Sequence, residues 1–167
     1  MSNVVILREI RFYISGVAVP KSRARTFPVL DDQGRVVVVN GKPLIKSRTP
    51  AKTLAWESYM AAIARQQAVI HKIKEPHDGP VALGMKFCHP IPKSWSESKK
   101  KRARNGLISP TSEMDLSNAI KSVEDAFEGI FYKNDSLIVA YVPISPLWKV
   151  YSDQPRIDIL VQFLSLT

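Results

Sequence analysis

The sequence holds few of the residues on which several protein classes depend. It has one cysteine, Cys88, and three scattered histidines among 167 residues, so an internal disulfide is excluded and a four-ligand zinc site is not expected. Its apolar runs are only a few residues long, whereas a membrane-spanning helix needs about 20. The residues after Met1 are polar, unlike the basic and then apolar start of a secretory leader. We therefore expect a cytoplasmic protein with no membrane partner.

Acidic residues are in the minority, and they are unevenly placed. The chain has 24 lysines and arginines against 15 aspartates and glutamates, a net charge of +9. Residues 1–112 hold 20 basic and 7 acidic residues, a net +13, whereas residues 113–167 hold 4 and 8, a net −4. A basic chain favours a polyanionic partner, and an acidic cluster within it favours a divalent cation beside a phosphate. This pattern predicts a metal-dependent enzyme acting on phosphate, although Glu124 and Glu128 by themselves are more typical of the solvated face of a helix.

Hydrophobic periodicity predicts an α+β fold, a single domain over residues 1–167 with one mixed β-sheet and two main helices. Gly129 stands where the cap of the second helix is expected. The expected order is a strand at 9–19, a mobile basic hairpin that turns near 32–34, a helix at 50–70, a strand at 81–91, a basic segment at 93–109, a helix at 115–129, a strand after the turn at 133–136, and a last strand at 155–166.

Two segments, residues 20–52 and 93–109, contain most of the basic residues. Runs of this kind are typical of solvated surface, and equally of contacts to DNA phosphates. Each segment also holds an aromatic residue, Phe27 or Trp95, that can stack on opened DNA. Aromatic residues in a mixed fold more often pack internally, so both interpretations stay open.

The acidic segment, residues 113–136, carries the chemistry. Asp115 stands at the start of the second helix, where it is either a simple N-cap or a metal ligand. Asn134 and Asp135 lie in the turn that follows the same helix. A 15-residue helix is about 22 Å long, so Asp115 and Asp135 can meet only if the chain doubles back or a second subunit contributes.

The run MDLSNAIKSVEDAFEGIFYKNDSLIVA, residues 114–140, resembles the signature of the RusA family of Holliday junction resolvases. Three further segments resemble the longer phage-type members of that family: GVAVPKSRAR at 16–25, RTPAKTLAWE at 48–57 and PKSWS at 92–96. The resemblance implies a homodimeric, Mg²⁺-dependent endonuclease that makes paired nicks in four-way DNA during recombination and repair, with Mn²⁺ as a possible substitute. It also implies a phage, prophage or bacterial source.

The same resemblance assigns residues. Its aspartates fall on Asp115 and Asp135, its helix lysine on Lys121 and its asparagine on Asn118. Carboxylate oxygens suit Mg²⁺, and a lysine suits charge that develops on phosphate. We expect catalysis by Asp115, Asp135 and Lys121, metal binding by Asp115, Asp135, Asn118, Glu113 and Ser117, and DNA binding by Lys21, Arg23, Arg25, Lys99, Lys100, Lys101, Arg102 and Arg104.

One position departs from the family pattern. Ser117 stands where the second aspartate is common, and a hydroxyl is a weaker ligand without negative charge. Glu113, or Asp125 from the polar stripe Ser117, Lys121 and Asp125, can replace the missing carboxylate. The alternative function is a non-catalytic protein that binds branched DNA and whose metal site Ser117 disables.

Overall fold

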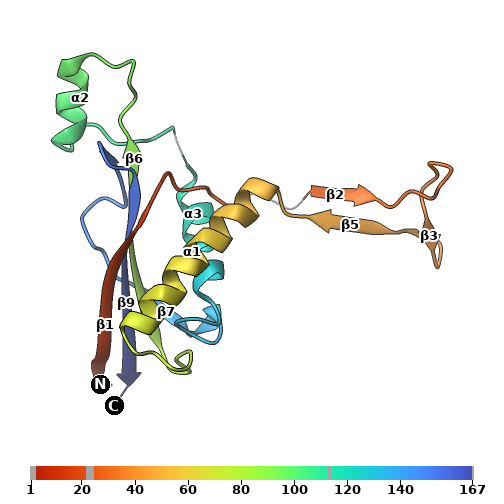
Figure 1. Ribbon diagram of the computed structural model, residues 1–167, viewed down its shortest axis with the longest axis horizontal. Coiled ribbons are helices and arrows are strands. Elements are labelled where there is room, and N and C mark those ends of the chain that lie inside the picture. Colours follow the sequence, from red (N-terminus) through yellow and green to blue (C-terminus); the bar gives the residue numbers. More distant parts are fainter. Residues whose placement is uncertain (1–2, 22–24, 113, 167) are drawn as a thin grey trace.

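A mixed five-stranded sheet forms the centre of the protein (Figure 1). The computed structural model describes residues 3–21, 25–112 and 114–166. In the sheet, β1 (Val4–Ser15) pairs antiparallel with β9 (Arg156–Leu166), and β9 pairs antiparallel with β6 (Val81–Pro90). The opposite edge of β6 is shared by two short parallel strands, β7 (Ile138–Tyr141) and β8 (Lys149–Ser152). The predicted α+β fold with one mixed sheet is confirmed.

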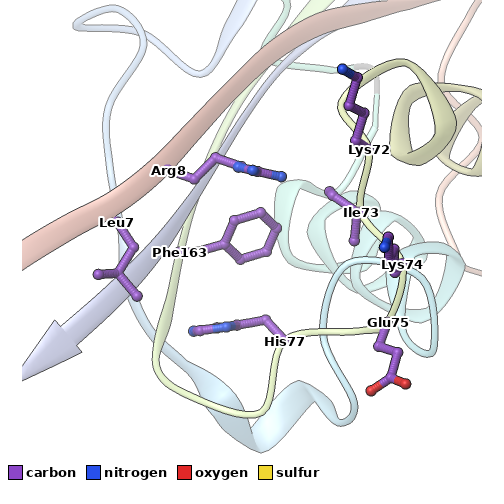
Figure 2. Close-up of a pocket in the computed structure, with 8 residues that line it drawn as sticks. All are labelled: Leu7, Arg8, Lys72, Ile73, Lys74, Glu75, His77 and Phe163. Atoms are coloured by element: carbon purple, nitrogen blue, oxygen red, sulfur yellow. The ribbon is translucent and has the colours of Figure 1, made fainter.

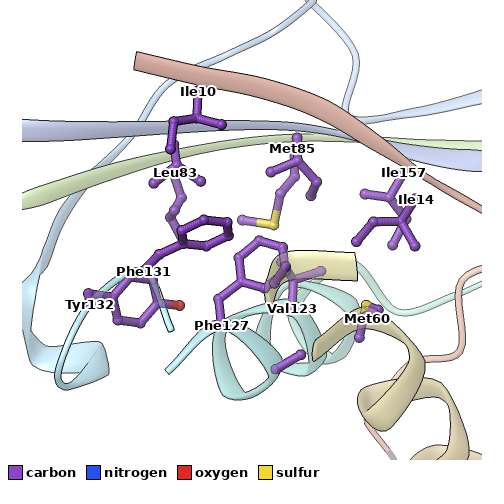
Figure 3. Packing of buried hydrophobic residues seen from close by; sticks show 14 of the residues in the cluster. Ile10, Ile14, Met60, Leu83, Met85, Val123, Phe127, Phe131, Tyr132 and Ile157 are labelled. Atoms are coloured by element: carbon purple, nitrogen blue, oxygen red, sulfur yellow. The ribbon is translucent and has the colours of Figure 1, made fainter. Parts of the chain in front are cut away.

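Two long helices, α1 (Ala51–Ile70) and α3 (Leu116–Phe127), cover one face of the sheet and contact each other. Alternate side chains of the central strands point toward the helices and meet aromatic rings from the end of α3 (Figure 3). Phe127 and Phe131 lie edge to face, with their ring centroids 5.2 Å apart, and both are fully buried. This packing fixes the position of α3 relative to the sheet.

The boundaries of α3 follow from its sequence. Its apolar residues recur at helical spacing, so one side is buried, including Ala119, Val123 and Phe127. The Asp115 side chain caps the first turn, and Gly129 has a φ of +72°, the left-handed conformation that ends many helices. The predicted cap at Gly129 is therefore confirmed.

The other face of the sheet is crossed by the segment between β7 and β8. Gly84 in β6 allows this close approach, because a Cβ atom there would lie 2.7 Å from the carbonyl oxygen of Val142. None of the helices in the described part of the chain is long and apolar enough to cross a membrane.

A narrow β-arm, residues 25–48, projects away from the sheet beyond the start of α1 (Figure 1). Its base is the pair β2 (Arg25–Pro28) and β5 (Ile45–Arg48), and near its tip β3 (Val38–Val39) pairs with β4 (Lys42–Pro43). A hairpin was predicted here with a turn near 32–34, and the turn from Asp31 to Arg35 is present. A second turn at Asn40 and Gly41 was not predicted.

Three features differ from the sequence-based expectation, and one of them is the short strand β8, which was not predicted. The first strand runs from Val4 to Ser15 rather than from 9 to 19. The basic segment 93–109 contains an additional helix, α2 (Glu97–Arg104), whose first turn is capped by the Ser96 hydroxyl accepting from the backbone N–H of Lys99. Ser96 and Glu97 stabilise the N-terminus of α2, which is otherwise a basic run.

Candidate functional site

Three carboxylates gather beside the C-terminal end of α3. One oxygen each from Asp125, Glu128 and Asp135 lies within 4.8 Å of the others, and we refer to these residues as the acidic cluster. Asp125 belongs to α3, Glu128 is its C-cap, and Asp135 opens the short 3-10 helix η1 (Asp135–Leu137). The chain doubles back after Gly129, but this brings Asp135 to Asp125 and Glu128, and the expected meeting of Asp135 with Asp115 is not part of this cluster.

The return of the chain is held by main-chain hydrogen bonds. The N–H of His77 donates to the carbonyl oxygen of Phe131 at 3.0 Å, and the N–H of Lys133 donates to the carbonyl oxygen of His77 at 3.0 Å. The Asn134 side chain then accepts from the backbone of Ser136 and starts η1. These bonds place Asp135 on the side of α3 rather than in free solvent.

Lys121 lies between these carboxylates. Its Nζ is 2.5 Å from Oδ2 of Asp135, 3.2 Å from Oδ1 of Asp125 and 3.6 Å from Oε2 of Glu124. The hydrogen bond between Lys121 and Asp135 raises the pKa of Lys121 and lowers the pKa of Asp135. Both groups therefore carry charge at neutral pH, so a cationic donor stands among ionised oxygen ligands.

Glu124 is buried, with 7% of its surface exposed, so the expected solvated face is wrong for this residue. The Tyr141 hydroxyl donates to its carboxylate, and the Tyr132 hydroxyl donates to its main-chain oxygen at 2.9 Å. Burial, together with the hydrogen bond to Glu124, raises the pKa of Tyr141 to about 12. A buried carboxylate is stable here because Tyr141 and Lys121 both pair with it.

A pocket of about 280 Å³ separates the acidic cluster from α1. Asp125 and Glu128 line one side, and Glu57 and Arg65 of α1 line the other. Lys21 spans the two helices: its Nζ pairs with Asp125 and lies 3.9 Å from Oε1 of Glu57. The pocket thus presents oxygen ligands beside an exposed arginine, an arrangement that suits a cation together with a phosphate.

Asp115 caps the opposite end of α3. Its Oδ1 accepts from the Ser117 hydroxyl at 2.7 Å, from the Ser117 N–H at 2.9 Å and from the Asn118 N–H at 3.4 Å. The hydrogen bond from the Ser117 hydroxyl is the main cause of a lowered Asp115 pKa. Asp115 is not one of the carboxylates that gather within 4.8 Å. Asp135 instead meets Lys121, which is six residues and about 9 Å along the axis from Asp115.

The predicted DNA-binding residues fall into two groups. Some have internal partners: Lys99 lies 3.8 Å from the centroid of the Trp95 ring, Lys100 pairs with Glu97 at 2.8 Å, Arg104 pairs with Asp153 at 2.8 Å, and Lys21 pairs with Asp125. Others are exposed and form no ion pair with the described residues: Arg25, Lys101 and Arg102. Arg23, like the predicted ligand Glu113, lies outside the described residues.

Trp95 packs against Tyr151 edge to face, with their centroids 5.0 Å apart. Of the two interpretations that the sequence left open for this ring, internal packing describes its position. Phe27, on the arm, is 48% exposed.

A pocket of about 450 Å³ lies beside the C-terminal end of α1 (Figure 2). Arg8, Lys72, Lys74 and His77 line it around the ring of Phe163, and none of the predicted site residues is among its lining residues.

A comparison with protein families matches residues 27–162 to the family described as Endodeoxyribonuclease RusA. The chain belongs to the RusA family. This RusA-family chain is also 36% identical over 140 residues to the Uncharacterized protein YqaN of Bacillus subtilis (strain 168), a match that covers 83% of this chain and 92% of that protein. The resemblance inferred from the sequence motifs is confirmed.

Several residues of this RusA-family site were not predicted from the sequence: Glu128, Glu57, Arg65 and Tyr141. Glu57 and Arg65 are two i,i+4 steps apart on α1, a spacing that places them along one stripe of the helix. That signal is weak because such stripes are common on solvated helices. Glu128 was assigned to a solvated face, and only the doubling back of the chain brings it to Asp135.

Proposed function

We propose that this RusA-family chain is a Mg²⁺-dependent endodeoxyribonuclease that resolves four-way DNA junctions by paired nicks, in DNA recombination or repair. The observation that carries the proposal is the acidic cluster with Lys121 among its carboxylates, in a protein of net charge +9. A negative cluster repels DNA unless a cation neutralises it, so its retention in a basic chain supports metal-dependent chemistry on phosphate.

The donor set fits a hard divalent cation. Three carboxylates offer only oxygen ligands, which Mg²⁺ and Mn²⁺ prefer. Their oxygens lie within 4.8 Å of one another, close to the separation of about 3 to 4 Å between ligands at 2.0–2.1 Å from one ion. We therefore assign Asp125, Glu128 and Asp135 to the cation. When bound, such a cation polarises the scissile phosphate and activates water.

Lys121 has a distinct role in this proposal. Its ammonium group holds Asp125 and Asp135 in place, and it offers further N–H donors to the negative charge that grows on phosphate. Glu124, which accepts a hydrogen bond from the Tyr141 hydroxyl, pairs with Lys121 from the buried side. Arg65, across the pocket, is placed to bind a phosphate oxygen and so to orient the strand.

The proposed site also includes the N-terminal end of the polar stripe on α3. Ser117, Lys121 and Asp125 recur every four residues, so they follow one side of α3. Asp115 and Asn118 stand at the start of this stripe, and we propose that they take part in metal or phosphate binding there. Paired nicks need two such sites, so the proposal includes a homodimer.

The test is a nicking assay on a labelled synthetic four-way junction with Mg²⁺ or Mn²⁺. We expect symmetric nicks from the wild type, and a rate lower by about 10²- to 10³-fold for Asp135→Asn, because one ligand charge and the partner of Lys121 are removed. Glu75→Gln, at an exposed acid in the loop after α1 and outside both the arm and the acidic cluster, is the control and should nick at the wild-type rate.

A different result would support the alternative. If the wild type binds the junction but makes no nick at any Mg²⁺ or Mn²⁺ concentration, the nuclease proposal fails. A non-catalytic branched-DNA-binding protein, in which Ser117 replaces a needed carboxylate, would then be the better description.

A further inference from the structure

The base of the arm has one face that gathers positive charge around an exposed ring. In the β2–β5 ladder, Arg25 stands directly opposite Arg48, and Phe27 stands opposite Lys46. Positions two apart on a strand share a face, so these four side chains lie together. The other face carries Thr26 opposite Ser47 and Pro28 opposite Ile45.

The same residues line a cleft. A space of about 310 Å³ is bordered by Arg25, Phe27 and Arg48 and by the residues that lead into α1, Thr49, Pro50 and Ala51. Its walls contain two cations and an aromatic ring, and no acidic residue. We call this space the arm cleft.

Arg25 and Arg48 form an unfavourable pair as they stand. Like charges directly opposite each other destabilise two paired strands, and neither residue forms an ion pair with the described part of the chain. An anion between the two guanidinium groups would remove this repulsion, and phosphate matches the paired N–H donors of arginine.

The exposed ring of Phe27 indicates that the ligand also has a flat group that can stack on it. Its ring is 48% exposed on the same face as the arginines, where it supports no core packing. Aromatic rings beside cations bind nucleotides by stacking on a base while the cations hold the backbone. In a continuous duplex the bases are stacked on one another, so an unstacked base is available only in a single strand or where strands separate.

We propose that the arm cleft binds one unstacked nucleotide at the branch point of DNA, with Phe27 on its base and with Arg25 and Arg48 on its phosphate. This inference rests on the proposed function, because it names the feature of the substrate that the arm recognises. It makes the arm the source of selectivity for branched over continuous DNA, separate from the acidic cluster that does the chemistry.

The test measures binding, with Ca²⁺ in place of Mg²⁺, to three fluorescent probes: a four-way junction, a linear duplex of matched sequence and a dT oligonucleotide. Phe27→Ala should weaken binding to the junction and to the single strand by about 5- to 20-fold, with duplex binding changed by less than about 2-fold. Phe27→Tyr should restore binding. Ile45→Ala, an exposed apolar residue on the opposite face, is the matched control and should change none of the three.

The arginines are tested by salt dependence. The double variant Arg25→Gln with Arg48→Gln should weaken binding to all probes and reduce the slope of log affinity against log salt by up to about 2. A loss on Phe27→Ala that is equal for duplex and junction, or no loss at all, would overturn the inference. If the wild type makes no nicks, the proposed nuclease function fails instead. The binding measurements still test the arm in that case, because they do not depend on cleavage.

Discussion

The arm and the acidic cluster both lie next to α1, but they differ in whether their basic side chains are paired with acids. The arm, residues 25–48, has five basic and two acidic residues, and Arg25, Lys46 and Arg48 form no ion pair with the described residues. At the cluster, by contrast, Lys21 and Lys121 each contact two or more carboxylates. These three basic groups of the arm are therefore free to bind phosphate, although Arg35 near the tip pairs with Asp31 at 3.0 Å, whereas the basic groups of the cluster hold the acids in place.

This difference distinguishes DNA binding from the positioning of catalytic acids, two roles that the net charge of +9 alone does not distinguish. Unpaired cations on a projecting arm give affinity, because they gain a partner when DNA binds. Paired cations inside the cluster gain less affinity, but they keep the ligand oxygens in a fixed arrangement for chemistry. The two regions should consequently respond differently to the same kind of substitution.

Among substitutions in α3, the largest effect is expected for the acid that serves as a metal ligand. Asp125→Asn should lower nicking by about 10²-fold and weaken Mn²⁺ binding by at least about 10-fold, because Asp125 belongs to the acidic cluster. Asp115→Asn should weaken Mn²⁺ binding less, since Asp115 is hydrogen-bonded as the cap of α3. Mn²⁺ affinity is measured by electron paramagnetic resonance.

Asp153→Asn, at an exposed acid that pairs with Arg104 at the end of α2, is the control for a lost surface carboxylate. If Asp115→Asn has the larger effect on Mn²⁺ binding, the cation lies at the start of α3 and the assignment to Asp125 and Glu128 is wrong.

The next comparison makes the same substitution at a buried phenylalanine of α3 and at an exposed phenylalanine of the arm. Phe127→Ala should lower the free energy of unfolding by about 3–5 kcal/mol, because the ring is fully buried between the sheet and the helices. Phe27→Ala should change it by less than about 0.5 kcal/mol, because the ring is exposed on the arm. Urea unfolding followed by circular dichroism gives both values. A cost above about 1 kcal/mol for Phe27→Ala would show that the ring supports the fold rather than a ligand.

Much of the sheet and of the helices that pack on it could be predicted from the sequence, because the patterns that specify them are local. The apolar spacing and the caps of α3 lie within residues 115–129, and the apolar run that begins at residue 81 and ends at prolines indicates a strand. The helix α2 was not predicted because its Lys and Arg residues resemble a solvated tract, and its stability depends on the contacts of Lys99 with Trp95 and of Arg104 with Asp153. Those partners are distant or ambiguous in the sequence.

The site was predicted less completely, for a different reason. Asp135 and Lys121 follow from the motif, and the structure brings them together. Glu128 lies three residues after Asp125, but the two acids meet Asp135 only because the left-handed Gly129 reverses the chain, and Glu57 faces them only because α1 packs beside α3. Neither event has a pattern at fixed spacing, so no reading of the sequence separates these acids from those of a solvated helix.

The smallest expected effect tests whether unpaired charge is what distinguishes the arm. Lys46→Gln should reduce the slope of log affinity against log salt by about 0.9, the value for one phosphate contact on duplex DNA. Lys86→Gln should leave the slope unchanged, because Lys86 pairs with Asp158 at 3.0 Å on the sheet. Fluorescence anisotropy with the four-way junction at several salt concentrations measures both slopes. Equal slopes for the two variants would mean that pairing within the chain does not decide which cations contact DNA, and the division between arm and body would then rest on shape alone.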